Sequence, residues 1–381
     1  MTNKILSAVL PLFASAVLTA ATPDQALSEG GVEAYEKAIA GVQTTPEQKK
    51  VYEARLAAMK GENAKAAELY QKLAEETESV DLAYGAYQAV KTILDPVLDV
   101  EKLGSFCDVI LEKIRKNNDR QQLYYHLLQE RFHYALTGEQ LDTAKKIHQE
   151  FFSQKNLSAD LQLELEIMQM HLYFADKQYE SGWKKMCEIE KFNENSPEKV
   201  KQRIRLLKTI TAQFCLEFWG ARGQYSKEII ASQIGQLPLE ERNTAVRLYI
   251  PFLIYHQKWA HAQQRLQSLE MIAGNSNTVR FSLLEQRRSI LLKEKKYDTV
   301  VKIYQNLARH YYLQHDIQRK CDIRICETYA MQEKYEAAAA FCRSVTHRHH
   351  ITTAYRKELH SWAKKYDDLA AEAARKKSQT Q

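Results

Sequence analysis

The chain has 381 residues, of which 45% are hydrophobic and 27% are charged, and its formal net charge is +6. This length exceeds one ordinary globular core, so several domains or a repeat array are expected. Only 12 glycines and 7 prolines are present, which argues against an all-β fold with many tight turns. Leu, Ala, Glu, Lys, Gln and Arg dominate, and these residues favour helices. We therefore predict an all-α protein.

Residues 1–21 have the layout of a secretory signal peptide. A short polar start is followed by the apolar run Ile5–Leu18 and by small residues ending at Ala21. An uncleaved membrane anchor is the alternative, although the run is short for a span and contains Pro11. No cysteine follows the run, so lipoprotein processing is not expected. The predicted location is the periplasm or exterior of a bacterial cell.

The first helices are predicted from local signals. Residues 22–44 are expected to form two short capping helices, because Gly30-Gly31 interrupts the pattern. Thr45, followed by Pro46 and Gln48, makes a capping box that opens a helix to about Met59. The apolar spacing of Ala64–Glu76 then predicts a returning helix. Two antiparallel helices joined by a tight turn make one hairpin.

This helix–turn–helix pattern recurs along the chain. The first residue after each turn is Asn63, Leu103, Leu141, Tyr179, Tyr225, Trp259, Tyr297 or Tyr335. The gaps between these markers run from 34 to 46 residues, and four of the seven are 38. A fixed period in this range predicts stacked units that cannot bury their apolar faces alone.

Two kinds of side chain accompany the markers. An aromatic ring at a marker is expected to plug the gap where two helices meet. Three positions later a small residue recurs, which lets two helix backbones approach closely. These small residues are Ala66, Ala144, Gly182, Ala262 and Ala338.

The units resemble tetratricopeptide repeats. Gly61, Ala66 and Tyr70 match the turn glycine, the small residue and the later aromatic of that family. Tyr297 and Tyr304 match in the seventh unit, and Tyr335 and Ala338 match in the eighth. The usual period is nearer 34, so these are long relatives. The resemblance implies a right-handed α-solenoid of about eight antiparallel helix hairpins over residues 45–346, with a superhelical groove that binds a protein or peptide.

Several features interrupt or end the array. The loop within residues 193–199 contains Ser196, expected to cap the next helix, and the array is predicted to bend there. Pro251 is expected to kink or break its helix. Residues 347–375 are predicted to hold a C-terminal capping helix, which the end of a solenoid requires. Residues 376–381 are predicted to be a disordered tail.

The sequence contains six cysteines and no CxxC motif. Cys326 and Cys342 are expected to face one another across the last hairpin, where a disulfide and two buried thiols are both open interpretations. His347–His350 is the densest group of metal-ligand side chains, but it has no carboxylate or cysteine at ligand spacing. No metal or cofactor is predicted.

Charge is distributed unevenly. Residues 251–381 contain 23 Lys and Arg against 13 Asp and Glu. This basic end could meet an acidic partner, such as an anionic glycan or lipid surface, or could simply form solvated helix faces.

No phosphate-binding glycine loop, HExxH or GxSxG motif occurs in the sequence. We therefore predict an exported, non-enzymatic scaffold that binds a protein or peptide, with no role in nucleic-acid binding. Two alternatives remain. One is an envelope accessory or lytic factor that positions a cell-wall glycan, and the other is a structural subunit of an envelope assembly.

Overall fold

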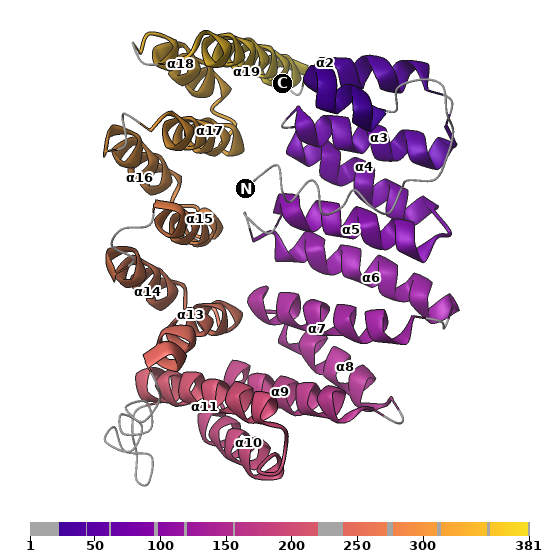
Figure 1. Ribbon diagram of the computed structural model, residues 1–381, viewed down its shortest axis with the longest axis vertical. Helices are drawn as coiled ribbons and strands as arrows, with labels where there is room; N and C mark the ends of the chain where they lie inside the picture. The colour runs from indigo at the N-terminus through magenta and orange to yellow at the C-terminus, as the bar shows by residue number, and fades with distance from the viewer. Residues whose placement is uncertain are drawn as a thin grey trace. The chain divides into compact units, whose positions relative to one another are not determined.

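The computed structural model describes residues 23–42, 44–60, 62–94, 98–117, 120–154, 157–219, 239–272, 277–310, 314–348 and 351–379. These residues form seventeen helices and no strand (Figure 1), which confirms the predicted all-α class. The chain divides into two compact units, one through Leu283 and one from Leu284. The division falls inside α15 (Asn277–Lys293).

In the first unit, each helix packs against the next helix described along the chain (Figure 1). This nearest-neighbour packing is typical of a repeat array. The helices are α2 (Pro23–Gly41), α3 (Pro46–Met59), α4 (Asn63–Glu76), α5 (Val80–Leu94), α6 (Val100–Asn117), α7 (Gln121–Thr137), α8 (Leu141–Phe152), α9 (Ala159–Ala175), α10 (Tyr179–Phe192), α11 (Glu198–Phe218), α13 (Leu239–Tyr255) and α14 (Trp259–Ile272).

The second unit continues this pattern. After the latter part of α15 it contains α16 (Tyr297–His310), α17 (His315–Met331), α18 (Tyr335–Thr346) and α19 (Thr353–Gln379). Packing proceeds from α16 to α17, α18 and α19 in chain order. Its apolar core includes Val345 of α18 and Leu359 of α19.

The predicted period coincides with helix boundaries. Six markers are the first residues of second helices, namely Asn63, Leu141, Tyr179, Trp259, Tyr297 and Tyr335. Leu103 lies three residues inside α6, and Tyr225 lies outside the described residues. Helices α13, α15, α17 and α19 begin at residues 239, 277, 315 and 353, which are 38 residues apart.

Five turns between a first helix and its second helix have the same three-residue geometry. The preceding helices α7, α9, α13, α15 and α17 all have 17 residues. The middle turn residue has a positive φ of 52° to 62°; these residues are Glu139, Lys177, Gln257, Lys295 and Glu333. The next backbone N–H donates to the carbonyl five residues earlier, at 2.8 to 3.0 Å. This hydrogen bond and left-handed residue define a Schellman motif, here formed without glycine.

The small residues mark the closest helix contacts. Ala66, Ala144, Ala262 and Ala338 are 0% exposed. A Cβ atom added to Gly182 of α10 would lie 2.6 Å from the Phe174 ring of α9. The marker rings of Tyr179, Trp259, Tyr297 and Tyr335 are only half-buried. Close approach at the small residue, more than a plug at the marker, therefore joins the two helices.

Three local expectations were wrong, and one alternative of a fourth was excluded. A single helix, α2, continues through Gly30-Gly31, since glycine costs a helix only about 1 kcal/mol and Tyr35 and Ile39 of α2 are buried. Helix α13 continues past Pro251, which excludes the predicted break there. The N-cap of α11 is Pro197, with no side-chain cap from Ser196.

The fourth difference lies at the C-terminus, where α19 runs to Gln379, beyond the predicted end at residue 375. An ion pair within the helix supports this last stretch. Lys376 Nζ lies 2.7 Å from Glu372 Oε1, one turn earlier. Within the described residues, no helix is both long enough and apolar enough to span a membrane. The predicted signal peptide lies outside the described residues.

We expect Gly182→Ala to lower the free energy of unfolding by roughly 1–3 kcal/mol, because the new methyl group overlaps the Phe174 ring. The matched control is Gly85→Ala in α5, where an added Cβ meets nothing within 4 Å. That variant should be neutral or more stable by up to about 1 kcal/mol. Urea unfolding followed by circular dichroism measures both. Equal stability of the two variants would contradict the close contact.

Lys295→Gly should raise the free energy of unfolding by about 0.5–1 kcal/mol, because glycine adopts the positive φ of 57° without a Cβ clash. Lys302→Gly replaces the same residue type at an exposed position in the interior of α16. It should lower stability by about 1 kcal/mol. A loss of stability in Lys295→Gly would rule out the turn geometry. Urea midpoints of the two proteins provide the comparison.

Candidate functional site

The carboxylate of Glu130 on α7 is contacted by donor groups from α5 and α7, both of which are first helices of hairpins. Glu130 accepts a hydrogen bond of 2.7 Å from the Tyr87 hydroxyl and forms an ion pair with Lys91, both on α5. His126 Nε2 lies 3.6 Å from Glu130 Oε1, and the Tyr87 and Tyr134 hydroxyl oxygens are 3.1 Å apart. These contacts tie α5 to α7 through polar groups.

Part of this cluster reaches the surface. Tyr84, at helical spacing from Tyr87 and Lys91, shares their face of α5 and is half-buried, as is Tyr134 on α7. The His126 side chain is 52% exposed. We call Tyr84, Lys91, His126, Glu130 and Tyr134 the α5–α7 face. It combines aromatic rings with charges of both signs, which is the composition of many protein-binding surfaces.

Next to Glu130, a cluster of rings joins helices distant in sequence. His133 of α7 stacks on Tyr255 of α13, with ring centroids 4.5 Å apart and an interplanar angle of 16°. His171 Nδ1 of α9 lies 3.0 Å from His256 Nε2, which follows α13. Gln257 also donates a hydrogen bond to the Leu136 carbonyl. Helix α13 therefore packs on α7 (Figure 1).

Desolvation keeps these histidines neutral at ordinary pH; His171 and His256 are buried, and His133 is half-buried between its neighbours. Burial lowers the pKa of His133 to about 4 and that of His256 to about 3, and it holds the pKa of His171 well below its usual value. Nδ1 of His256 is buried without a hydrogen-bond partner among the described residues. Although three imidazoles are close together, the described part of the chain contains no group of three or more residues arranged to hold a metal ion.

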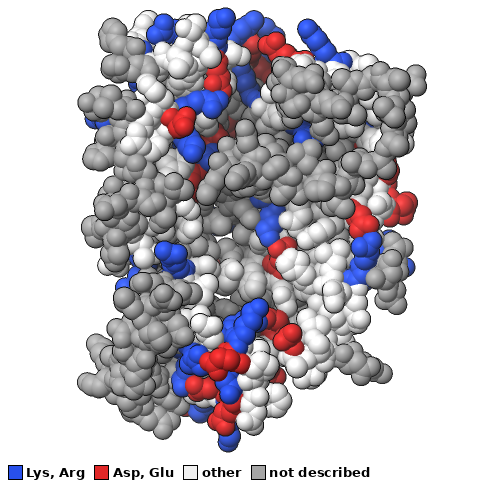
Figure 2. Space-filling view, viewed as in Figure 1, with Lys and Arg blue, Asp and Glu red and all other residues white. Residues whose placement is uncertain are grey.

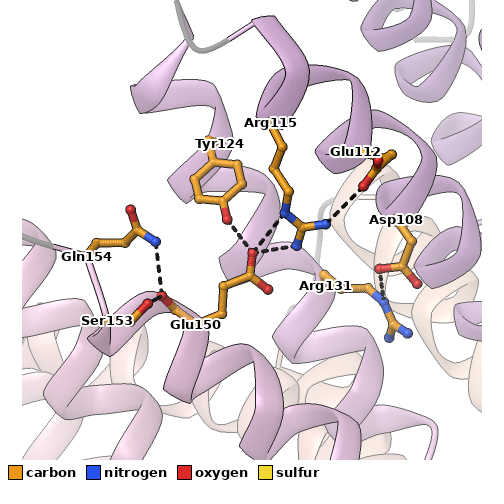
Figure 3. A network of polar contacts seen from close by, with 8 residues as sticks. All are labelled: Asp108, Glu112, Arg115, Tyr124, Arg131, Glu150, Ser153 and Gln154. Atoms are coloured by element: carbon orange, nitrogen blue, oxygen red, sulfur yellow. Dashed lines mark hydrogen bonds and ion pairs between the residues drawn. The ribbon is translucent and has the colours of Figure 1, made fainter.

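A second polar network connects α6, α7 and α8 (Figure 3). Glu150 of α8 accepts hydrogen bonds from Arg115 of α6 and from the Tyr124 hydroxyl of α7. Arg131 Nε of α7 donates to Asp108 Oδ1 of α6 at 2.9 Å. A Cβ on Gly104 would lie 2.9 Å from Arg131 Nη1, so this glycine makes room for the guanidinium. The network bridges successive helices.

In the second unit, a buried acid anchors the connector before α19. Asp322 of α17 is 0% exposed, and its oxygens lie 3.1 and 3.0 Å from Arg348 Nη1. The Tyr355 hydroxyl donates to Asp322 at 3.2 Å. Burial raises the pKa of Asp322, and Arg348 opposes that rise. Arg348, from the predicted histidine-rich group, therefore has a packing role; His347 is exposed, and His349 and His350 lie outside the described residues.

Much of the basic charge in the second unit is paired. Arg324 contacts Glu285 at 2.6 Å and Glu327 at 2.9 Å, and Arg288 contacts Glu327 at 2.9 Å. On the face in Figure 2, coloured basic side chains lie beside acidic ones. Arg288 and Arg324 are therefore paired with carboxylates.

The predicted structural residues lie at helix contacts. Tyr70 and Tyr304 are buried, as are the small residues, while Leu141 is half-buried. Cys326 and Cys342 face one another as predicted. Gly61 lies outside the described residues. Sequence reasoning missed Glu130, His133 and His171 because first helices do not repeat their side chains; the spacing of Tyr84, Tyr87 and Lys91 was the available signal.

No family model matches the chain, and no curated protein matches it. Evidence about its function therefore comes from its own residues and their contacts.

We expect the free energy of unfolding to fall as pH decreases from about 6.5 toward about 4. Histidines in the unfolded chain take up protons below their ordinary pKa of 6.5, whereas the folded protein keeps His133 neutral down to a pKa of about 4. The unfolded state then binds more protons and gains stability. Urea unfolding at a series of pH values measures the slope.

His133→Phe keeps a ring against Tyr255 and removes one titrating group, so its slope between pH 6.5 and 5 should be smaller. The charged groups nearest the histidine cluster are Glu130, Lys91 and Lys258, and they are unchanged in this variant. His360→Gln, which replaces an exposed residue of α19, serves as the control and should keep the original slope. An unchanged slope in His133→Phe would contradict the prediction.

Proposed function

We propose that the protein is an exported, non-enzymatic scaffold that binds a protein or peptide partner in the cell envelope. In this proposal residues 1–21 direct export. Residues 45–346 form a right-handed superhelix of about eight hairpins, as the resemblance to tetratricopeptide repeats implies. The first helices of successive hairpins present the binding surface, and charge on that surface selects the partner.

The main support is the recurrence of one unit. Five first helices have the same length of 17 residues, and each is followed by the same three-residue turn. Stacked helical units of this kind present extended surfaces suited to chain-like ligands. Second helices carry the repeated small residues, while the first helices are free to vary.

The α5–α7 face is the proposed contact region. Tyrosine is prominent among residues that contribute strongly to protein interfaces, and Tyr84 and Tyr134 are both half-buried there. Lys91 and Glu130 pair with each other there, and His126, with a side chain that is 52% exposed, adds a polar group at the surface. On the other side of His133, α13 already covers α7, so the face toward α5 is the better candidate.

The test uses the purified full chain as bait for an envelope extract from the source organism, with bound proteins identified by mass spectrometry. We expect recovery of a defined partner that then binds the pure protein directly. Retention on purified cell-wall glycan, with no protein partner, would instead favour the glycan-positioning alternative. A fixed-stoichiometry complex that persists through purification would favour the structural subunit.

With the partner in hand, Tyr84→Ala should weaken binding by tenfold or more, which corresponds to about 1.4 kcal/mol. The matched control is Lys146→Ala, an exposed position on second helix α8, which should leave the dissociation constant unchanged. Calorimetry or surface plasmon resonance measures both. Equal affinities of the two variants would exclude the α5–α7 face.

A further inference from the structure

Two thiols meet in the last hairpin of the second unit. Cys326 lies on α17 and Cys342 on α18, and their Sγ atoms are 3.3 Å apart. Both side chains are almost completely buried, at 1% and 0% exposure. The residues are 16 positions apart in sequence, so a bond between them would close a short loop around the turn.

The sulfur pair is at the centre of the contacts that hold the end of the chain together. Its core neighbours are Val345 of α18 and Tyr355, Leu359 and Ala363 of α19. Trp362 and Tyr366 pack against the same cluster. A covalent link here would fix α17 to α18, on which α19 packs.

We propose that Cys326 and Cys342 form a disulfide bond. The reaction is thiol–disulfide exchange with an oxidant of the disulfide class, such as oxidised glutathione or a disulfide-bearing oxidoreductase. One S–S bond forms between Cys326 and Cys342, and one breaks in the oxidant. The two cysteines lose two electrons, and the oxidant takes up these electrons and two protons to become two thiols.

Burial determines when this exchange takes place. The attacking species is a thiolate, and the hydrogen bond with Cys342, together with burial, raises the pKa of Cys326 well above its usual value. An external oxidant also cannot reach sulfurs with so little exposed surface. The bond therefore forms during folding, or when α18 and α19 open, and is afterwards protected from reductants. This inference is independent of the partner-binding proposal.

Two samples of the full chain are refolded from denaturant in parallel. One contains a mixture of reduced and oxidised glutathione, and the other contains dithiothreitol. Free thiols are then alkylated under denaturing, non-reducing conditions and mapped by peptide mass. We expect a Cys326–Cys342 linked peptide in the glutathione sample and two alkylated cysteines in the dithiothreitol sample. Recovery of both cysteines alkylated from the glutathione sample would overturn the proposal, as would a link to another cysteine.

Variants separate this pair from its neighbour. Cys321 is a buried thiol five positions before Cys326 on the same helix, so Cys321→Ser should leave the link intact. Cys342→Ser should abolish it and leave Cys326 open to alkylation after denaturation. If Cys342→Ser fails to fold, the wild-type mapping still decides.

A second measurement uses the native protein. Adding oxidised glutathione to the folded, reduced chain should form the link slowly, and moderate urea should accelerate it at least tenfold by opening the buried site. Equal rates with and without urea would contradict formation through an opened state.

Discussion

Close approach between a first helix and its second helix is the constraint on which this structure depends. The fourth residue of each described second helix that starts at a marker is buried, whether it is the alanine of α4, α8, α14 and α18 or the glycine of α10. Val300 holds the same position in α16, and Phe106 lies three residues after Leu103 in α6; both are buried. The residue at this position therefore stays in the contact between the two helices even when its side chain is large. The neighbouring side chains must then adjust to its size.

The turn and the small residue act together. A helix end with a left-handed residue fixes the direction in which the chain leaves, and the second helix then returns along the first. The turns at Glu139, Lys177, Gln257, Lys295 and Glu333 repeat this geometry although none contains glycine at that residue. The tertiary contacts that follow each turn must offset the steric cost, about 1 kcal/mol or more per turn.

The period, the helix class and most starts of second helices were predictable, because apolar spacing and turn residues are local signals. The limits are also physical. Gly30-Gly31 and Pro251 are breakers by propensity, but α2 and α13 continue through them, and packing outside the local window decides such cases. The left-handed turn residues are not glycines, so no glycine in the sequence marked these turns. The period does not predict that His133 of α7 contacts Tyr255 of α13. This contact joins repeats that are distant in sequence, and it is made by first helices, whose side chains do not repeat.

The first helices carry most of the unusual chemistry. Buried imidazoles join α9 to the end of α13, the half-buried His133 joins α7 to α13, and buried or half-buried ion pairs join α15 to α17. Such groups need particular partners, since an unpaired buried charge is costly. They restrict which first helices can be neighbours. The second helices are too similar to set the order of the repeats, so these first-helix groups set it. The same variability makes first helices the natural location for partner selection, as we propose for the α5–α7 face.

The position of α19 has a consequence for how such a chain grows. It begins 38 residues after α17, in register with the preceding first helices, but it is a single helix of 27 residues with no second helix described after it. Stacking by itself has no length limit, because each unit offers its successor the surface that it received. A repeat unit inserted before Thr353 would, however, have to reproduce the contacts that Asp322 of α17 makes with Arg348 and with Tyr355 of α19. The number of repeat units in such a chain is therefore constrained by side-chain contacts between first helices as well as by stacking.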